Sequence, residues 1–327
     1  MPSAYTLTVE SSYWKYKSPF VITGYTFTGM DLLTVSISRD GITGRGEAAG
    51  VYYFDETGAS MLAQVEAVRS KLEQGVSRSA LRELLPAGGA RNAVDCALWD
   101  FEAKQQGKSI WELTGLVPQA THSVMTLSID TPEAMAHAAR QIEGQRIKVK
   151  LDGHQPLERI TAVCAARPDA EIVVDVNQGW SFEQLRTLAP SFSQLGVAMI
   201  EQPLPRGADE SLEDYAAPIT LCADESCLDT NDFEQVARRY QMINIKLDKT
   251  GGLTEALELA KLAKDHGMAL MVGNMVGTSL AMAPAYVLAQ LCRFVDIDGM
   301  LFLTQDREHP MHFEAGLVAA PTPALWG

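Results

Sequence analysis

The sequence lacks the features that mark secreted, membrane-spanning or disulfide-rich proteins. Its five cysteines are an odd number and form no C-x-x-C pair, so we expect reduced thiols rather than a disulfide framework. No apolar run is long enough to cross a bilayer, and the first residues lack the basic start and apolar core of a signal peptide. Together these absences predict a soluble, cytoplasmic protein.

Positive charge is also scarce. The chain carries 27 Lys and Arg residues against 41 Asp and Glu residues, which gives a net charge of −14 at pH 7. Such a surface repels the phosphates of nucleic acids and of anionic lipids. We therefore expect no nucleic-acid partner and no membrane partner, and the composition leaves assembly into a homo-oligomer open.

A third absence bears on the fold. The sequence has no G-x-G-x-x-G turn of the kind that follows the first strand in many doubly wound sheets. From about residue 121, short apolar strands alternate with helical runs, which is typical of an α/β barrel. We predict a (β/α)7β TIM-like barrel over residues 116–300, with strands at Ser123–Ile129, Ile147–Leu151, Glu171–Val176, Ala198–Glu201, Thr220–Ala223, Met242–Leu247, Ala269–Val272 and Phe294–Ile297. The helices between them are expected at Thr131–Glu143, Pro156–Ala166, Glu183–Leu195, Asp232–Arg239, Leu253–Lys264 and Ser279–Cys292.

The first 115 residues have a different pattern. Period-two alternation in Thr6–Glu10 and Leu32–Ser38 indicates antiparallel strands, and Ala59–Glu73 and Arg91–Gln106 have helical periodicity. We predict an α+β capping domain over residues 1–115. The segment Ser18–Gly29 between the two strands is either a lid loop or an ordinary hairpin connection. Residues 301–327 no longer follow the barrel repeat and are expected to return to the capping domain.

Charged residues recur at the predicted strand ends. Lys150, Asp175, Glu201, Asp224 and Lys246 follow one another at steps of 25, 26, 23 and 22 residues, about the length of one strand–helix repeat. One charged side chain therefore falls at the same height on each of five successive strands. The carboxyl ends of barrel strands are where active sites lie.

The three acidic residues of this series predict a metal site. Asp175, Glu201 and Asp224 supply only oxygen ligands, which favours Mg²⁺. Each acid by itself could cap a helix or pair with a lysine. Three in a row at barrel spacing, flanked by lysines, are better explained by a divalent cation, because three buried carboxylates repel one another.

The lysines predict acid–base chemistry. Strands two and six lie roughly across a barrel from each other, so Lys150 and Lys246 are expected to face the pore from opposite sides. A nearby cation is expected to lower their pKa toward the working range. Two such bases suit removal of a proton on one face of a carbon and its return on the other. Lys148 projects on the same side of its strand as Lys150 and can reach a carboxylate oxygen.

At these residues the chain resembles the enolase superfamily, in its muconate-lactonizing subgroup. The resemblance rests on motifs that run through nearly the whole chain: Lys148-Val-Lys150, Asp175-Val-Asn177, Glu201-Gln-Pro203, Ala223-Asp224-Glu225-Ser226, Asn244–Gly252 and the helix Ala90–Asp100. Enzymes of this superfamily pair a Lys or His base with Mg²⁺. Within the subgroup the chain looks most like the dipeptide epimerases of the L-Ala-D/L-Glu type, because Asp296-Ile-Asp298 matches their D-x-D on the last strand.

The resemblance implies a Mg²⁺-dependent epimerisation at the α-carbon of the C-terminal residue of a dipeptide. Lys150 and Lys246 would exchange the α-proton through an enolate, and Asp296 and Asp298 would hold the ammonium group of the dipeptide. Thr126 and the loop Asn274–Thr278, which contains Met275, would line the pocket. The resemblance also suggests a role in murein-peptide recycling. Which lysine serves which enantiomer is left open.

One segment departs from the pattern of the Glu-specific members, in which a basic residue of the lid loop is expected to pair the substrate side chain. Thr23–Met30 contains no Arg or Lys. Tyr25, Phe27 and Met30 instead favour a neutral or apolar second residue of the dipeptide. Competing functions are a muconate cycloisomerase or o-succinylbenzoate synthase reaction, a Schiff-base aldolase using Lys246, and a non-catalytic barrel that binds a ligand.

Overall fold

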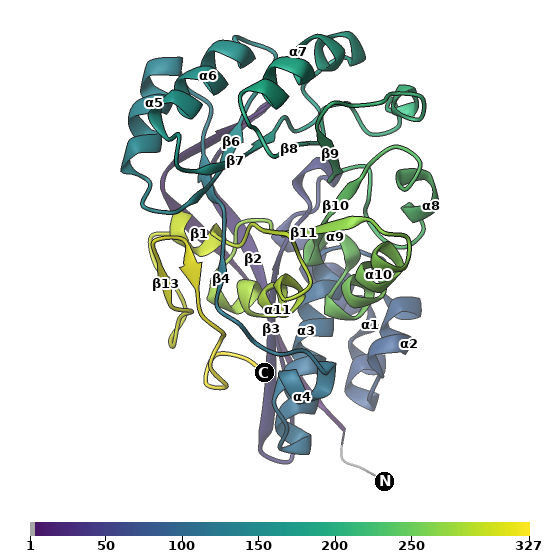
Figure 1. Ribbon diagram of the computed structural model, residues 1–327. Coiled ribbons are helices and arrows are strands. Elements are labelled where there is room, and N and C mark those ends of the chain that lie inside the picture. Colours follow the sequence, from purple (N-terminus) through teal and green to yellow (C-terminus); the bar gives the residue numbers. More distant parts are fainter. Residues whose placement is uncertain (1–3) are drawn as a thin grey trace.

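The computed structural model describes residues 4–327. Three long strands pair in the order β1-β2-β3 as an antiparallel sheet, and three helices pack on it at the lower right of Figure 1. These elements are β1 (Thr6–Ile22), β2 (Tyr25–Arg39), β3 (Ile42–Ala49), α1 (Gly58–Gln74), α2 (Arg78–Leu84) and α3 (Gly89–Gln106), with a 3-10 turn, η1 (Tyr52–Phe54), before α1. This is the α+β part that the alternation and periodicity predict.

The first hairpin is longer than predicted. Most of the segment 18–29 is strand rather than loop, because β1 continues to Ile22 and β2 begins at Tyr25. Only Thr23 and Gly24 form the turn, and Gly24 has a φ of 77°, which a glycine adopts without strain. The segment is therefore a hairpin rather than a loop, and its role as a lid stays a prediction. Threonine and aromatic residues favour extended backbone strongly enough to outweigh the glycines.

Helix α3 joins the two parts of the molecule. On one side it lies directly on β3, where a side chain at Gly44 or Gly46 would overlap the α3 backbone. On the other side, Asp95 accepts hydrogen bonds from the backbone N–H and the hydroxyl of Thr254. Arg91 donates to the carbonyl of Thr250 at 2.6 Å. Since both α3 residues are buried, these contacts fix the first domain against the second.

Eight parallel strands form the second sheet, in the order β12-β11-β10-β9-β8-β7-β6-β5. Its first and last strands also meet, because Ser123 forms a parallel bridge with Val295. The predicted barrel-type fold is confirmed. The strands are β5 (Met125–Leu127), β6 (Arg146–Lys150), β7 (Glu171–Asp175), β8 (Met199–Glu201), β9 (Thr220–Ala223), β10 (Met242–Lys246), β11 (Ala269–Gly273) and β12 (Phe294–Val295).

Helices cover the outside of this curled sheet (Figure 1). Most lie within a few residues of their predicted bounds: α5 (Pro132–Gln141), α6 (Pro156–Ala166), α7 (Phe182–Gln194), α10 (Leu253–Asp265) and α11 (Ser279–Ala289). The repeat is irregular after β8, where only a 3-10 turn, η2 (Glu210–Leu212), precedes β9 and α8 (Phe233–Val236) is shorter than predicted. A further short helix, α9 (Leu247–Thr250), follows β10, where the sequence pattern predicts none. It ends at Gly251, whose φ is 71°.

The last segment contacts both parts of the chain. After η3 (Gly299–Phe302), strand β14 (Leu317–Val318) pairs on one side with β13 (Phe313–Glu314) and on the other with β4 (Thr121–His122), which follows α4 (Ile110–Thr114). The indole of Trp326 donates to the carbonyl of Cys96 at 3.0 Å, and the N–H of Gly327 donates to Asp100 at 2.7 Å. The terminal residues thus contact helix α3. The boundaries at residues 115 and 300 stay a prediction.

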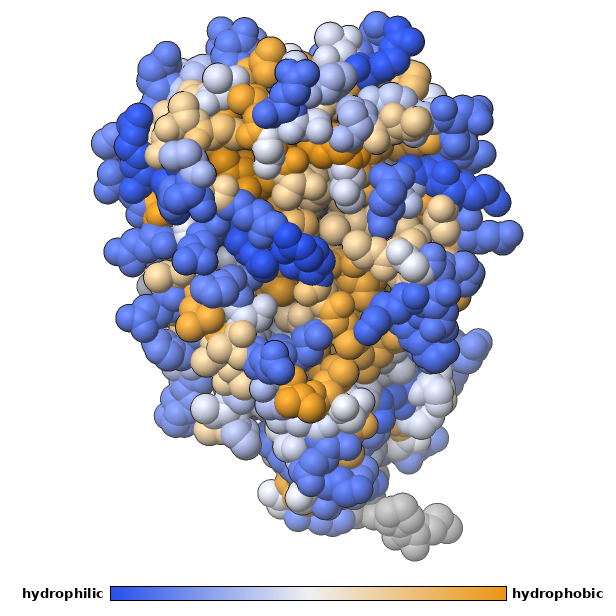
Figure 2. Space-filling view, in the orientation of Figure 1, coloured by the Kyte–Doolittle hydropathy of each residue, from blue (hydrophilic) through white to orange (hydrophobic). Residues whose placement is uncertain are grey.

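The surface agrees with the composition. Charged and polar residues cover most of the rim of the face in Figure 2, and apolar residues gather toward its middle. Among residues 4–327, no helix has both the length and the apolar character that crossing a membrane requires.

Candidate active site

The three predicted metal ligands lie side by side at the carboxyl ends of adjacent strands. Asp175 and Glu201 end β7 and β8 and are register partners, and Asp224 directly follows β9. Each offers a carboxylate oxygen that lies within 4.8 Å of the other two, and all three side chains are buried. The parallel register brings together residues that are 26 and 23 positions apart in the sequence.

The two predicted bases flank this trio. Lys150 Nζ lies 2.6 Å from Asp175 Oδ2 and 3.1 Å from Asn177 Oδ1, on one side of the acidic residues. Lys246 Nζ lies 2.7 Å from Asp224 Oδ2, on the other side. Both lysines line the same cavity, of about 60 Å³. The structure therefore places two amines at one small space, each in contact with a different member of the trio.

Lys148 occupies the centre of the acidic cluster. Its ammonium group lies 3.0 Å from Asp175 Oδ2, 2.8 Å from Glu201 Oε2 and 2.8 Å from Asp296 Oδ2. The side chain is only 1% exposed and does not line the cavity. Lys148 thus links two of the predicted metal ligands to Asp296 of the D-x-D pair, which follows β12.

Charge in the site is unbalanced. Among the described residues, six buried carboxyl groups lie close to four buried ammonium groups, an excess of two negative charges when all ten groups are ionised (Asp175, Glu201, Asp224, Glu225, Asp296 and Asp298 against Lys148, Lys150, Lys246 and Lys249). Burial, together with the negative charge of Asp175, raises the pKa of Glu201 to about 7. Burial and the neighbouring Asp224 raise the pKa of Glu225 to about 8, and one oxygen of Glu225 has no hydrogen-bond partner among the described residues.

A divalent cation would correct this excess. Three buried carboxylates that converge with oxygen donors only are the ligand set that Mg²⁺ prefers. The residues present therefore fit a magnesium ion. Burial lowers the pKa of Lys246, but the carboxylate of Asp224 outweighs it, so that among these side chains alone the pKa stands above its ordinary value. The predicted lowering of the lysine pKa by a cation stays a prediction.

The D-x-D pair lies beside the trio and is engaged by the protein itself. Asp298 accepts a hydrogen bond of 2.8 Å from the backbone N–H of Thr126, so these two predicted pocket residues are in contact. Asp296 accepts a hydrogen bond from Lys148. Burial, and then the charge of Asp296, raise the pKa of Asp298 to about 7. Neither aspartate lines the cavity in this conformation.

The capping domain supplies one wall of the cavity. Its aromatic and aliphatic side chains, with the loop after β11, complete the lining: Tyr16, Phe20, Ile22, Phe27, Met30, Tyr52, Asn274, Met275 and Val276. Met275, which the sequence predicts as a pocket residue, is among them. Tyr25 is not: it is 45% exposed and stacks on Phe27, with ring centroids 5.8 Å apart.

Lys249 is a residue of the site to which the sequence pattern assigns no role. Its Nζ lies 2.6 Å from Asp224 Oδ1 and also donates to the carbonyls of Cys227 and Asn244 at 3.0 and 2.9 Å. Asp224 is therefore held by a lysine on each oxygen, Lys249 on one and Lys246 on the other. The only sequence signal is the position of Lys249 three residues after Lys246, one turn into the unpredicted helix α9.

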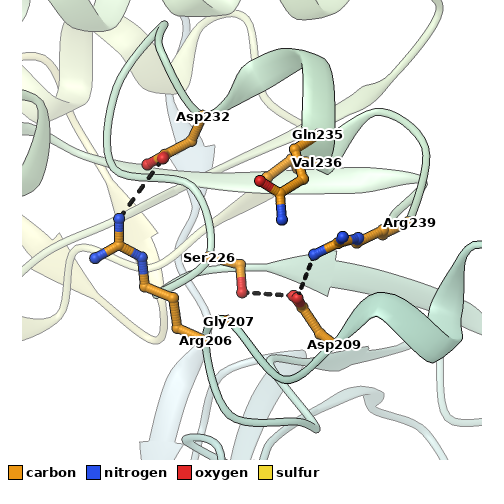
Figure 3. Close-up of a pocket in the computed structure, with 8 residues that line it drawn as sticks. All are labelled: Arg206, Gly207, Asp209, Ser226, Asp232, Gln235, Val236 and Arg239. Atoms are coloured by element: carbon orange, nitrogen blue, oxygen red, sulfur yellow. Dashed lines mark hydrogen bonds and ion pairs between the residues drawn. The ribbon is translucent and has the colours of Figure 1, made fainter.

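A second polar pocket, of about 370 Å³, lies outside the trio, between the segment after β8 and helix α8 (Figure 3). Its polar and charged groups pair with each other: Arg239 and Ser226 both contact Asp209 at 2.7 Å. Ser226 in turn donates its N–H to the side chain of Gln202, which also accepts from the N–H of Asp224. This pocket thus supports the loops that carry two metal ligands.

Profiles of two protein families match the chain and together cover most of it. The profile described as "Mandelate racemase / muconate lactonizing enzyme, N-terminal domain" matches residues 4–115. The profile described as "Enolase C-terminal domain-like" matches residues 133–324.

Two characterised relatives are 41% identical to the chain. One is an L-Ala-D/L-Glu epimerase of Escherichia coli, where the match covers 95% of this chain and 98% of the relative. The other is an N-acetyl-D-glutamate racemase of a Pseudoalteromonas species, with 90% of this chain and 95% of the relative covered.

Solved structures agree with these relatives. An enolase family member from Agrobacterium tumefaciens with homology to dipeptide epimerases, bound to sodium and L-Ala-L-Glu, has a TM-score of 0.96 and 38% identity, over 99% of this chain and 100% of that one. A dipeptide epimerase from Enterococcus faecalis, complexed with Mg and L-Leu-L-Tyr, has a TM-score of 0.90 and 25% identity, over 98% and 97% of the two chains. The chain belongs to the mandelate racemase and muconate lactonizing enzyme family of the enolase superfamily.

Proposed function

We propose that this protein is a Mg²⁺-dependent epimerase, an isomerase that inverts the α-carbon of the C-terminal residue of a dipeptide. The observation that carries the proposal is the pair of lysines on either side of one acidic trio, both lining a single small cavity. The relatives and structures that match almost the whole chain support it, because they include dipeptide epimerases with Mg and dipeptides bound.

Asp175, Glu201 and Asp224 would hold the ion, and a bound Mg²⁺ would supply positive charge where the substrate carboxylate gains electron density. Lys150 and Lys246 would act on the α-proton from opposite faces, one removing it and the other returning a proton. Each lysine is within hydrogen-bond distance of one ligand of the ion. Charge on the metal ligands and protonation of the bases are therefore coupled.

The remaining predicted contacts concern the rest of the substrate. We propose that Asp296 and Asp298, which follow β12, hold the ammonium group of the dipeptide and that Thr126 keeps Asp298 in place. Lys148 would bring positive charge to the substrate carboxylate while it holds Asp296. Met275 would pack on the substrate, and Tyr25, which is half exposed, would act from the rim through its contact with Phe27.

A second candidate is racemisation of an N-acyl amino acid, which uses the same proton transfer. Two observations favour it: Asp296 and Asp298 are engaged by Lys148 and Thr126 and do not line the cavity, and one 41% identical relative is an N-acetyl-D-glutamate racemase. An N-acyl substrate has no ammonium group, so it would need neither aspartate. The Asp298→Asn variant separates the two, because it should impair turnover of a dipeptide and spare turnover of an N-acetyl amino acid.

Four further functions have less support. Muconate cycloisomerisation and o-succinylbenzoate formation also involve no ammonium group, and the two relatives with 41% identity are an epimerase and a racemase. A Schiff-base aldolase or a non-catalytic barrel would not require the acidic trio with two flanking lysines. We further propose that the enzyme works in the cytoplasm on peptides released from murein, without a nucleic-acid or membrane partner, and that it is able to form a homo-oligomer.

The experiment that tests the proposal is a dipeptide library incubated with the protein in D₂O with Mg²⁺ and analysed by mass spectrometry. We expect deuterium at the α-carbon of the C-terminal residue for some members, and none in EDTA. A parallel set of N-acetyl amino acids tests the second candidate. Absence of exchange in both sets would contradict the proposed function.

A further inference from the structure

The wall that the capping domain contributes to the cavity is mostly apolar. Four of its six lining side chains are Phe20, Ile22, Phe27 and Met30, and the other two are the tyrosines Tyr16 and Tyr52. Among the described residues that line the cavity, the only cationic side chains are the two lysines of the barrel. A buried carboxylate against this wall would lack a counter-ion.

Tyr16 differs from Tyr52 because its hydroxyl is buried without a hydrogen-bond partner among the described residues. It lies on β1, is only 2% exposed, and packs against the buried Leu303 and near the ring of Phe302, 6.5 Å away. Burial raises the pKa of Tyr16, so the hydroxyl keeps its proton and is available as a donor. Tyr16 as a residue lines the cavity, and a buried polar group that the fold leaves unpaired requires an explanation, which a ligand acceptor would supply.

The geometry of the proposed reaction indicates which part of the substrate would meet Tyr16. This step rests on the proposed function. The α-carbon carries four substituents. The proton lies between Lys150 and Lys246, the carboxylate lies at the metal trio, and the nitrogen side leads toward Asp296 and Asp298. The side chain remains, and the capping-domain wall is the remaining side of the cavity.

We propose that the hydroxyl of Tyr16 donates a hydrogen bond to an oxygen in the side chain of the residue that is epimerised. The preferred side chain is then one whose body packs on Phe27 and Met30 and whose end carries a neutral acceptor, as in glutamine. A side chain of similar length that offers only a weak acceptor, as the thioether of methionine does, leaves the hydroxyl without a strong hydrogen bond. This sharpens the expectation of a neutral second residue, because it separates amide side chains from aliphatic ones.

The test compares kcat/KM for α-proton exchange of L-Ala-L-Gln and L-Ala-L-Met in D₂O with Mg²⁺, for the wild type and Tyr16→Phe. We expect Tyr16→Phe to lower kcat/KM for L-Ala-L-Gln about tenfold and to change that for L-Ala-L-Met less than about twofold. The matched control is Tyr13→Phe, because Tyr13 lies on the same strand, is 61% exposed and does not line the cavity. It should leave both rates unchanged.

Thermal unfolding provides a second, independent measurement. Because the hydroxyl has no partner among the described residues, Tyr16→Phe should be at least as stable as the wild type. A clear loss of stability would mean that the hydroxyl has a partner within the protein and would overturn the assignment. An equal effect of Tyr16→Phe on both dipeptides, or none on either, would also overturn it while leaving the epimerase function standing. No exchange by the wild type with any dipeptide would contradict the function itself.

Discussion

Replacing Lys249 by methionine removes a buried charge that the sequence pattern does not identify as functional. The ammonium group lies 2.6 Å from Asp224 Oδ1 and also binds backbone carbonyls, including those of Cys227 and Asn244. Both side chains of the Lys249–Asp224 pair are fully buried. Removing one partner of a buried ion pair costs about 3–5 kcal/mol, because the other charge is left uncompensated. Lys246 still contacts Asp224 in the variant, so we expect a loss near the lower end, about 3 kcal/mol.

Urea unfolding at fixed Mg²⁺, followed by circular dichroism, measures this loss as a shift of the midpoint at constant slope. The matched control is Lys261→Met, because Lys261 also pairs with an aspartate but is 80% exposed, so its loss should stay below about 1 kcal/mol. Mg²⁺ affinity provides the second measurement, and Lys249→Met should lower it about 10- to 100-fold, since Lys249 orients a metal ligand. The reasoning about Lys249 would be refuted if Lys249→Met and Lys261→Met lowered the free energy of unfolding by the same small amount and bound Mg²⁺ with equal affinity.

Two further predictions concern the metal and pH. Because the site carries two excess negative charges, EDTA should abolish exchange and destabilise the fold, and Mg²⁺ at about 100 times its Kd should restore activity and add about 2.7 kcal/mol to the free energy of unfolding; an unchanged melting temperature would contradict this. Burial raises the pKa of Asp95 to about 6, although Thr254 hydrogen-bonds its carboxylate. The folded protein therefore binds a proton more tightly than the unfolded chain, and this contribution to stability is lost as pH rises from about 4 to 6, by about 3 kcal/mol in total. Asp95→Asn should flatten the dependence of unfolding free energy on pH in that window. The free energy is measured by urea unfolding at pH 4.5 and 7.5, and a difference between the two pH values equal to that of the wild type would refute the assignment.

The residues at the ends of the barrel strands could be predicted from the strand pattern and the parallel register together. Apolar residues define the strands, and parallel register then brings Asp175, Glu201 and Asp224 to one edge whatever the loops between them do. The same register puts Lys150 beside Asp175. These contacts follow from the repeat length alone, so the acidic trio and one of the two proposed bases are accessible to reasoning from the sequence.

Contacts that depend on how separate elements pack could not be predicted in this way. Tyr16 faces the cavity only because the β1–β2 hairpin folds over the barrel, and its strand position gives no sign of that. The aromatic and apolar residues near Tyr25 in the sequence predict that Tyr25 lines the pocket. In the structure Tyr25 begins strand β2 and its side chain lies half exposed at the rim. The role of Lys249 depends on α9, a helix of four residues that is too short to show a period.

The central claim is that Lys150 and Lys246 are two bases acting on opposite faces of one carbon. It is tested most directly by incubating the L,L and L,D forms of one accepted dipeptide in D₂O with each single variant, Lys150→Met and Lys246→Met. Both variants should lose epimerisation by at least about 10²-fold. Each should still exchange the α-proton of one enantiomer, and the two should retain opposite enantiomers. If both variants exchanged the same enantiomer, or if either still epimerised at the wild-type rate, the two-base account would be contradicted.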